Sequence, residues 1–137
     1  MVPLLQNEAK HVYQQSIDLG NGLAAYQLGM LVEKQLRLDE AEAAYWQGVA
    51  LDNGRAAHGL GLMLEKQKRL DEAEQFYRKA VDLNDGIAAV KLGKLLERQN
   101  RLEEAEQAYQ RGIELNVGWA GRRYKRMNKT PGQNNLR

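Results

Sequence analysis

Hydrophobic positions along residues 54–85 recur with the spacing of an α-helix, in two blocks separated by a polar turn. In the first block the apolar residues are Ala56, Ala57, Leu60, Met63 and Leu64. In the second block they are Leu70, Ala73, Tyr77, Ala80 and Val81. Spacings of three and four residues place each set on one face of a helix. The pattern therefore predicts two helices joined by a turn at residues 65–69.

This pair of blocks is repeated without a gap, with a period of 32 residues, at 22–53, 54–85 and 86–117. The residues shared by all three copies include Gly22, Gly54 and Gly86; Leu28-Gly29, Leu60-Gly61 and Leu92-Gly93; Arg37-Leu38, Arg69-Leu70 and Arg101-Leu102; and Tyr45, Tyr77 and Tyr109. One helix pair cannot bury both of its apolar faces, whereas stacked pairs can. The sequence thus predicts an all-α fold, an αα-hairpin solenoid in which antiparallel helix pairs form a right-handed superhelix.

The repeat frame continues past both ends of the three full copies. Residues 6–21 match the second half of a repeat, and residues 118–128 match the first half of another before the pattern diverges. We therefore expect a single solenoid domain over residues 1–128, with a half repeat at 1–21 and a capping helix at 118–128. The remaining residues, 129–137, are expected to form a flexible basic and polar tail.

The ends of the predicted helices carry charges that suit the helix dipole. Each second helix is expected to open at an acidic residue that is followed three positions later by glutamate, as in Asp71 and Glu74, which resembles a capping box.

A glycine inside each first helix costs stability, so its recurrence indicates close backbone approach. We expect Gly61 to face Ala73, with the corresponding pairs Gly29 and Ala41, and Gly93 and Ala105.

These recurring residues resemble the tetratricopeptide repeat. The resemblance rests on Leu-Gly, then alanine twelve residues after that glycine, then tyrosine four residues later and a small residue three after that. In this chain the elements are Leu28-Gly29, Ala41, Tyr45, Gly48; Leu60-Gly61, Ala73, Tyr77, Ala80; and Leu92-Gly93, Ala105, Tyr109, Gly112. The period is two residues shorter than the usual 34 and, with the Gly-x-Ala-Ala start, also resembles the related Sel-type repeats. The resemblance implies a protein-interaction scaffold with no catalysis and no cofactor.

The resemblance also implies that the first helices line a concave groove. The positions expected to bind a protein or peptide partner are Leu23, Tyr26, Met30, His58, Leu62, Lys91, Lys94, Arg122, Arg123 and Arg126. Further positions expected to line the groove are Gln27, Glu33, Arg55, Gly59, Glu65, Ile87, Val90, Glu97 and Trp119. The groove is expected to begin apolar and to end basic, so its ligand would combine apolar anchors with an acidic group.

Composition narrows the class of protein. The chain has no cysteine, so a disulfide scaffold, a thiolate zinc site and a cysteine nucleophile are excluded. Its apolar runs are far shorter than a bilayer span, and its start lacks the pattern of a signal peptide, so a cytoplasmic protein without membrane contact is expected. The net charge of +2 combines an acidic repeat body with a basic end, because residues 118–137 contain six Lys and Arg and no acidic residue.

Two other functions remain open as alternatives. The chain could form homo-oligomers through its terminal helices, since apolar residues of the half repeat lack a partner helix. Those residues are Val2, Leu4, Leu5, Val12 and Ile17. The basic C-terminal helix could also bind nucleic acid or an acidic partner, of which nucleic acid is the less favoured. An enzyme and a metal site are not expected, because the two histidines, His11 and His58, are far apart and the acidic clusters recur in every repeat.

Overall fold

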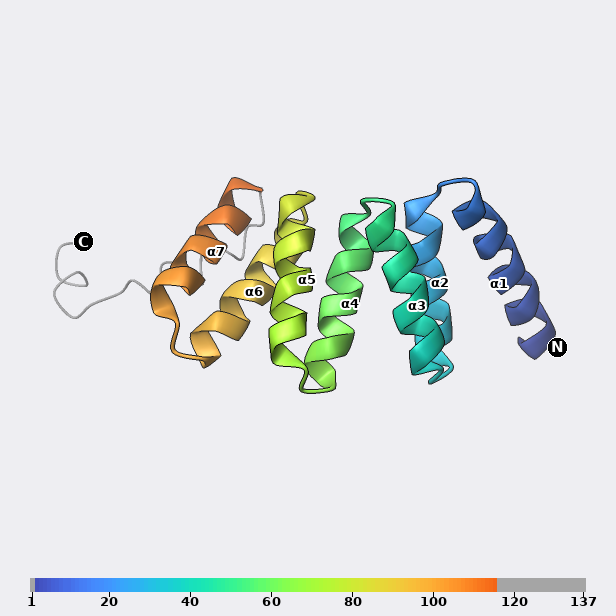
Figure 1. Ribbon diagram of the computed structural model, residues 1–137, viewed down its shortest axis with the longest axis horizontal. Coiled ribbons are helices and arrows are strands. Elements are labelled where there is room, and N and C mark those ends of the chain that lie inside the picture. The colour runs from blue at the N-terminus through green and yellow to red at the C-terminus, as the bar shows by residue number, and fades with distance from the viewer. Residues whose placement is uncertain (1, 116–137) are drawn as a thin grey trace, which may run out of the picture. The chain divides into compact units, whose positions relative to one another are not determined.

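Consecutive helices make up the part of the chain that the computed structural model describes, which is the backbone of residues 2–115 and the side chains of residues 6–115 (Figure 1). The seven helices within this range are α1 (Val2–Asp18), α2 (Gly22–Lys34), α3 (Leu38–Ala50), α4 (Gly54–Lys66), α5 (Leu70–Asp82), α6 (Gly86–Arg98) and α7 (Leu102–Glu114). From α2 onward every helix has 13 residues. The predicted all-α hairpin solenoid class is confirmed, and the predicted capping helix at 118–128 lies outside the described residues.

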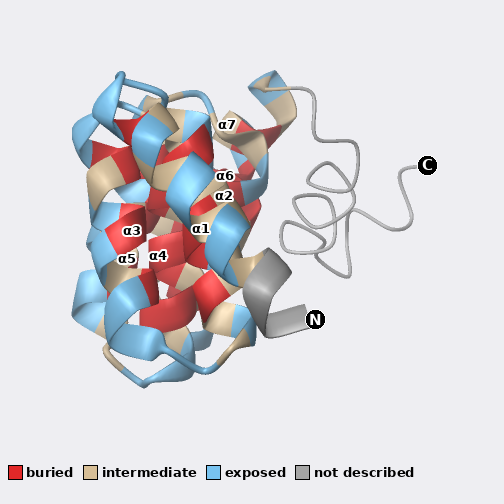
Figure 2. Cartoon of the chain, turned by 90° about the vertical axis from the view of Figure 1, so that its right-hand side faces the viewer, coloured by how far each residue is buried: buried red, intermediate tan, exposed pale blue. Residues whose placement is uncertain are grey.

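The helices fall into two compact units. Unit 1 (Met1–Leu83) contains α1 to α5, and unit 2 (Asn84–Arg137) contains α6 and α7. In unit 1, α2 pairs with α3 and α4 with α5, while α3 packs on α4, and α2 contacts both α1 and α4. Buried residues lie where these helices face one another, and exposed residues gather at the turns and outer faces (Figure 2). Ile17 is 6% exposed in this core, so the prediction that it forms an open association surface is wrong, whereas Val12 is 57% exposed.

A buried tyrosine fills the centre of each helix pair. Tyr77 is fully buried, and a Cβ added to Gly61 would lie 2.6 Å from its Cδ1 atom. The same relation joins Tyr45 to Gly29 in the preceding pair and Tyr109 to Gly93 in unit 2. The predicted close approach at these glycines is therefore correct, and the nearest atoms belong to the aromatic ring, which occupies the space that the missing side chain leaves. The expected contact with an alanine of the second helix stays a prediction.

The first and second helices of each repeat begin in different ways. Asn21, Asn53 and Asp85 cap the first helices, each accepting a hydrogen bond from a backbone N–H three residues later at 2.8–3.1 Å. The second helices start after an arginine, and no side chain caps them. Arg69 instead binds Glu72, with Nη2 and Oε2 2.7 Å apart, and holds the pKa of the Glu72 carboxyl below its usual range. The capping-box prediction is thus wrong, although acidic residues do occupy the first turn.

The turn between α2 and α3 contains a strained leucine. Leu36 has a φ of 60° and its side chain is 81% exposed. This left-handed conformation costs an L-residue about 1–2 kcal/mol, and asparagine tolerates it better. Asn100 occupies the same place in the third repeat with a φ of 59°. We expect Leu36→Asn to raise the free energy of unfolding by about 1 kcal/mol, measured by urea denaturation. A lower midpoint would show that Leu36 makes a stabilising contact.

Candidate protein-binding surface

Five side chains predicted to bind a partner lie on neighbouring helices of unit 1. We call this set the first-helix surface, and it consists of Leu23, Tyr26 and Met30 on α2 and His58 and Leu62 on α4. Leu23 is 42% and Met30 36% exposed, and the other three are half-buried. Tyr26 and Met30 occupy the same repeat positions as His58 and Leu62, and α2 contacts α4. This strip of aromatic and apolar residues therefore lies on two helices that contact each other.

Buried tyrosines contact the two aromatic members of the first-helix surface, Tyr26 and His58. The ring of Tyr26 lies 6.3 Å from that of Tyr45, and the ring of His58 lies 6.2 Å from that of Tyr77. Both separations fall in the range of tilted aromatic contacts. Each aromatic side chain of the first-helix surface therefore packs against the tyrosine of its own repeat, which limits the rotamers it can adopt.

A further glycine, Gly59, lies against one of these buried tyrosines. Gly59 is buried, and a Cβ placed there would lie 2.9 Å from Cε1 of Tyr45. The prediction that Gly59 lines the groove is wrong, because it packs against a tyrosine of the preceding repeat. The ring of Tyr45 is consequently flanked by glycines from α2 and α4 and links two successive repeats.

The glutamates predicted for the groove accept hydrogen bonds from the buried tyrosines. The hydroxyl of Tyr45 donates to Glu33 Oε1 at 2.7 Å, that of Tyr77 to Glu65 at 2.6 Å and that of Tyr109 to Glu97 at 2.8 Å. Burial, and next the bond to the Glu33 carboxylate, raise the pKa of Tyr45 well above its ordinary value. Glu33 also lies 3.7 Å from Lys66 of the next repeat. The constant spacing of twelve residues between glutamate and tyrosine was the sequence signal for this bond.

The predicted basic part of the groove belongs to unit 2. Lys91 and Lys94 are half-buried on α6, and Ile87 on the same helix is 47% exposed. Val90 is fully buried, so its assignment to the groove is wrong, because its side chain joins the core of the helix pair. Arg122, Arg123 and Arg126 lie outside the described residues. How the basic residues continue the first-helix surface therefore remains a prediction.

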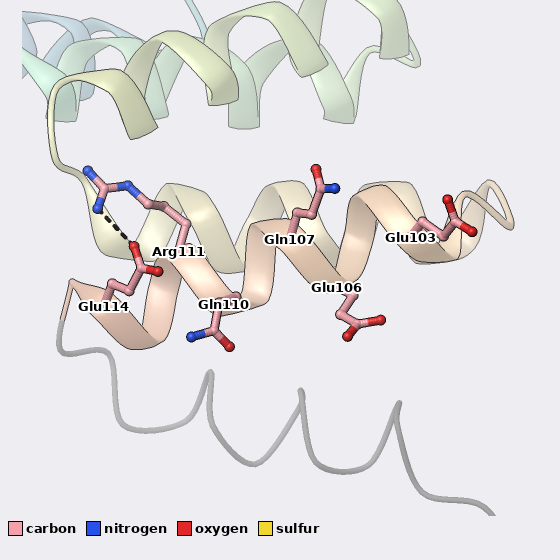
Figure 3. A pocket seen from close by; sticks show the side chains of 6 residues that line it. All are labelled: Glu103, Glu106, Gln107, Gln110, Arg111 and Glu114. Atoms are coloured by element: carbon pink, nitrogen blue, oxygen red, sulfur yellow. Dashed lines mark hydrogen bonds and ion pairs between the residues drawn. The ribbon is translucent and has the colours of Figure 1, made fainter.

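An open hollow lies over α7, where the sequence predicted no binding residue. Its lining consists of Glu103, Glu106, Gln107, Gln110, Arg111 and Glu114 (Figure 3). Arg111 pairs with Glu114 at 3.2 Å. Ligand sites usually combine apolar walls with a few polar groups, whereas all six of these side chains are polar. The first-helix surface of unit 1 is therefore the better candidate for apolar recognition.

Comparison with family models decides the identity of the repeats. Models described as tetratricopeptide repeat match residues 26–86 and 88–116, which together make up more than half of the chain. The chain belongs to the tetratricopeptide repeat family. No curated protein sequence matches it. Proteins of this family commonly serve as protein-interaction scaffolds.

Solved structures of tetratricopeptide and Sel1 repeat proteins share the fold. A Sel1 repeat protein from Oxalobacter formigenes matches with a TM-score of 0.74 at 18% identity, covering 88% of this chain and 54% of its own. MamA matches with a TM-score of 0.65 at 22% identity, covering 85% of this chain and 72% of its own. PilF from Pseudomonas aeruginosa matches with a TM-score of 0.62 at 21% identity, covering 74% and 50%. This tetratricopeptide repeat chain thus spans about half the length of the Sel1 repeat protein.

The length and apolar character of the described helices decide whether any of them could span a membrane in this tetratricopeptide repeat protein. None of the helices within residues 2–115 is both long enough and apolar enough to cross a bilayer.

Proposed function

We propose that this protein is a non-catalytic scaffold that binds a segment of another protein on the first-helix surface. The observation that carries the proposal is the exposure of Leu23 and Met30 beside half-buried Tyr26. Aromatic and methionine side chains are enriched where proteins bind one another, and rigid aromatic anchors lose little entropy on binding. The matching segment would place apolar side chains against this strip in an extended or helical form.

The basic residues of the third repeat extend the proposal to the charge of the ligand. Lys91 and Lys94 stand on α6 at the positions that Gly59 and Leu62 occupy on α4. Lysine ammonium groups attract carboxylates and add specificity to an apolar contact. The predicted ligand therefore carries an acidic group beyond its apolar anchors, and Arg122, Arg123 and Arg126 are proposed to extend the basic region.

The test is affinity capture with matched variants, followed by mass spectrometry. Met30→Glu is expected to reduce capture of the specific partner at least about tenfold, because it places a charge in an apolar contact. Lys94 occupies the same repeat position on α6, so a charged residue is compatible with this position of the repeat. The control, Gln75→Glu, makes the same change in charge on the exposed side of α5 and is expected to leave capture unchanged.

A second variant tests the basic residues of the third repeat, Lys91 and Lys94. Lys91→Glu combined with Lys94→Glu is expected to abolish capture of an acidic partner while circular dichroism still reports the folded helices. Equal capture by the wild type and by both groove variants would contradict the proposal.

A further inference from the structure

The outer side of α3 departs from the repeat pattern. Three exposed positions there, which we call the outer stripe, carry apolar residues, Ala43, Trp46 and Ala50. At the same positions the other second helices carry only polar residues. These are His11, Gln14 and Asp18 on α1, Gln75, Arg78 and Asp82 on α5, and Gln107, Gln110 and Glu114 on α7. The spacing of three and four residues places the outer stripe on one face of α3.

A second departure from the repeat meets the first in space. Phe76 on α5 stands where α3 and α7 carry Ala44 and Ala108. Its ring centroid lies 4.8 Å from that of Trp46, with the planes at 87°, an edge-to-face contact. Trp46 nevertheless remains 49% exposed. Two substitutions in different repeats thus build one aromatic cluster on the outer surface of unit 1, away from the buried core.

Two ion pairs join α3 and α5, or the residues next to their ends, on either side of the cluster along the chain. Arg69 joins Glu42 at 3.3 Å near the start of α3, and Lys79 joins Asp52 at 3.8 Å just beyond its end. These pairs also show that α3 and α5 run in the same direction. An aromatic centre with a charged rim is the usual anatomy of a protein–protein interface, in which central aromatic residues contribute most of the binding energy.

We propose that the outer stripe is a self-association surface, occupied by α3 of a second copy of this chain in antiparallel orientation. The stripe is nearly symmetric about Trp46, with an alanine three residues before it and another four residues after it. A two-fold axis near Trp46 would therefore place Ala43 opposite Ala50 of the second copy, and small residues allow close approach of the two helices.

The charges beside the stripe favour the same orientation. Asp39 is exposed at the start of α3 on the line of the stripe, and Lys79 lies at its far end with its side chain 44% exposed. In an antiparallel pair, Asp39 of each copy would approach Lys79 of the other. A parallel pair would instead place the acidic first turns of α3, with Asp39 and Glu40, against each other. The outer stripe is separate from the first-helix surface. Self-association through it is a further function, independent of the binding of a partner protein proposed above.

Sedimentation equilibrium over a range of protein concentrations tests the proposal. We expect a reversible dimer whose dissociation constant rises at least about tenfold in Trp46→Gln, a substitution that introduces the residue of α1 and α7. Ala43→Gln, which introduces the residue of α5 and α7, is expected to act in the same direction. Met30→Glu on the first-helix surface is the control and is expected to dimerise like the wild type. Circular dichroism checks that each variant is folded.

A charge exchange tests the orientation. Asp39→Lys and Lys79→Asp are each expected to weaken the dimer at neutral pH, and the double variant is expected to recover most of the lost affinity, because the pair is restored with opposite sign. A wild-type chain that remains monomeric up to about 1 mM would overturn the proposal. So would a dimer that is unaffected by Trp46→Gln, because another surface would then hold it. These outcomes do not involve the partner captured by the first-helix surface.

Discussion

Replacing Tyr77 with alanine is expected to lower the free energy of unfolding by about 3–5 kcal/mol, the range typical of large aromatic truncations in a core. Tyr77 is fully buried and its ring fills the space beside Gly61, which has no side chain to expand into the resulting cavity. The hydroxyl bond to Glu65 at 2.6 Å is lost as well. Urea denaturation followed by circular dichroism measures the change.

Tyr77→Phe is the matched control, because it keeps the ring and removes only the hydroxyl. This variant is expected to lower the free energy of unfolding by at most about 1–3 kcal/mol. The half-buried Glu65 carboxylate loses a hydrogen-bond donor but retains access to water. A Tyr77→Ala variant no less stable than Tyr77→Phe would contradict the view that the buried ring holds each helix pair together.

Introducing valine at Gly61 is the second change with a large expected effect. The new Cβ would lie 2.6 Å from the Tyr77 ring, closer than carbon atoms approach in folded proteins. Overpacking of this kind costs about 1–3 kcal/mol, and the difference in helix propensity between glycine and valine is too small to offset it. The free energy of unfolding is therefore expected to fall by about 2 kcal/mol in denaturant titration.

A double variant shows whether the ring is the cause. In the Tyr77→Ala background, Gly61→Val is expected to cost at least about 1 kcal/mol less than in the wild type, because the valine then enters a cavity instead of meeting a ring. Equal costs in the two backgrounds would mean that Gly61 is required for another reason, such as its backbone conformation.

The periodicity of the sequence was sufficient to predict the fold class and the helix pairs. Apolar spacing gives the face of a helix directly, and 32-residue recurrence requires stacking. It could not identify the neighbour of each small residue. The periodicity did not predict that the Tyr77 ring lies against Gly61, because helix crossing geometry and ring orientation depend on the whole packed pair.

Burial was also harder to predict than periodicity. Val90 and Ile17 were expected on open surfaces, but both are buried. Glu65 was expected in the groove, yet its carboxylate accepts a bond from a tyrosine twelve residues later. The aromatic contact between Trp46 and Phe76 joins two positions at which the repeats differ, so the residues that the repeats share do not predict it.

Site-specific photo-crosslinking tests whether the first-helix surface contacts a partner protein. A photoreactive phenylalanine analogue is placed at Met30 or Leu62 on the first-helix surface, or at Gln75 on α5 as a control, and the protein is irradiated in cells. We expect crosslinks to the same partner protein from positions 30 and 62 and none to that partner from position 75. Crosslinks to a partner from position 75, with none from 30 or 62, would contradict this expectation.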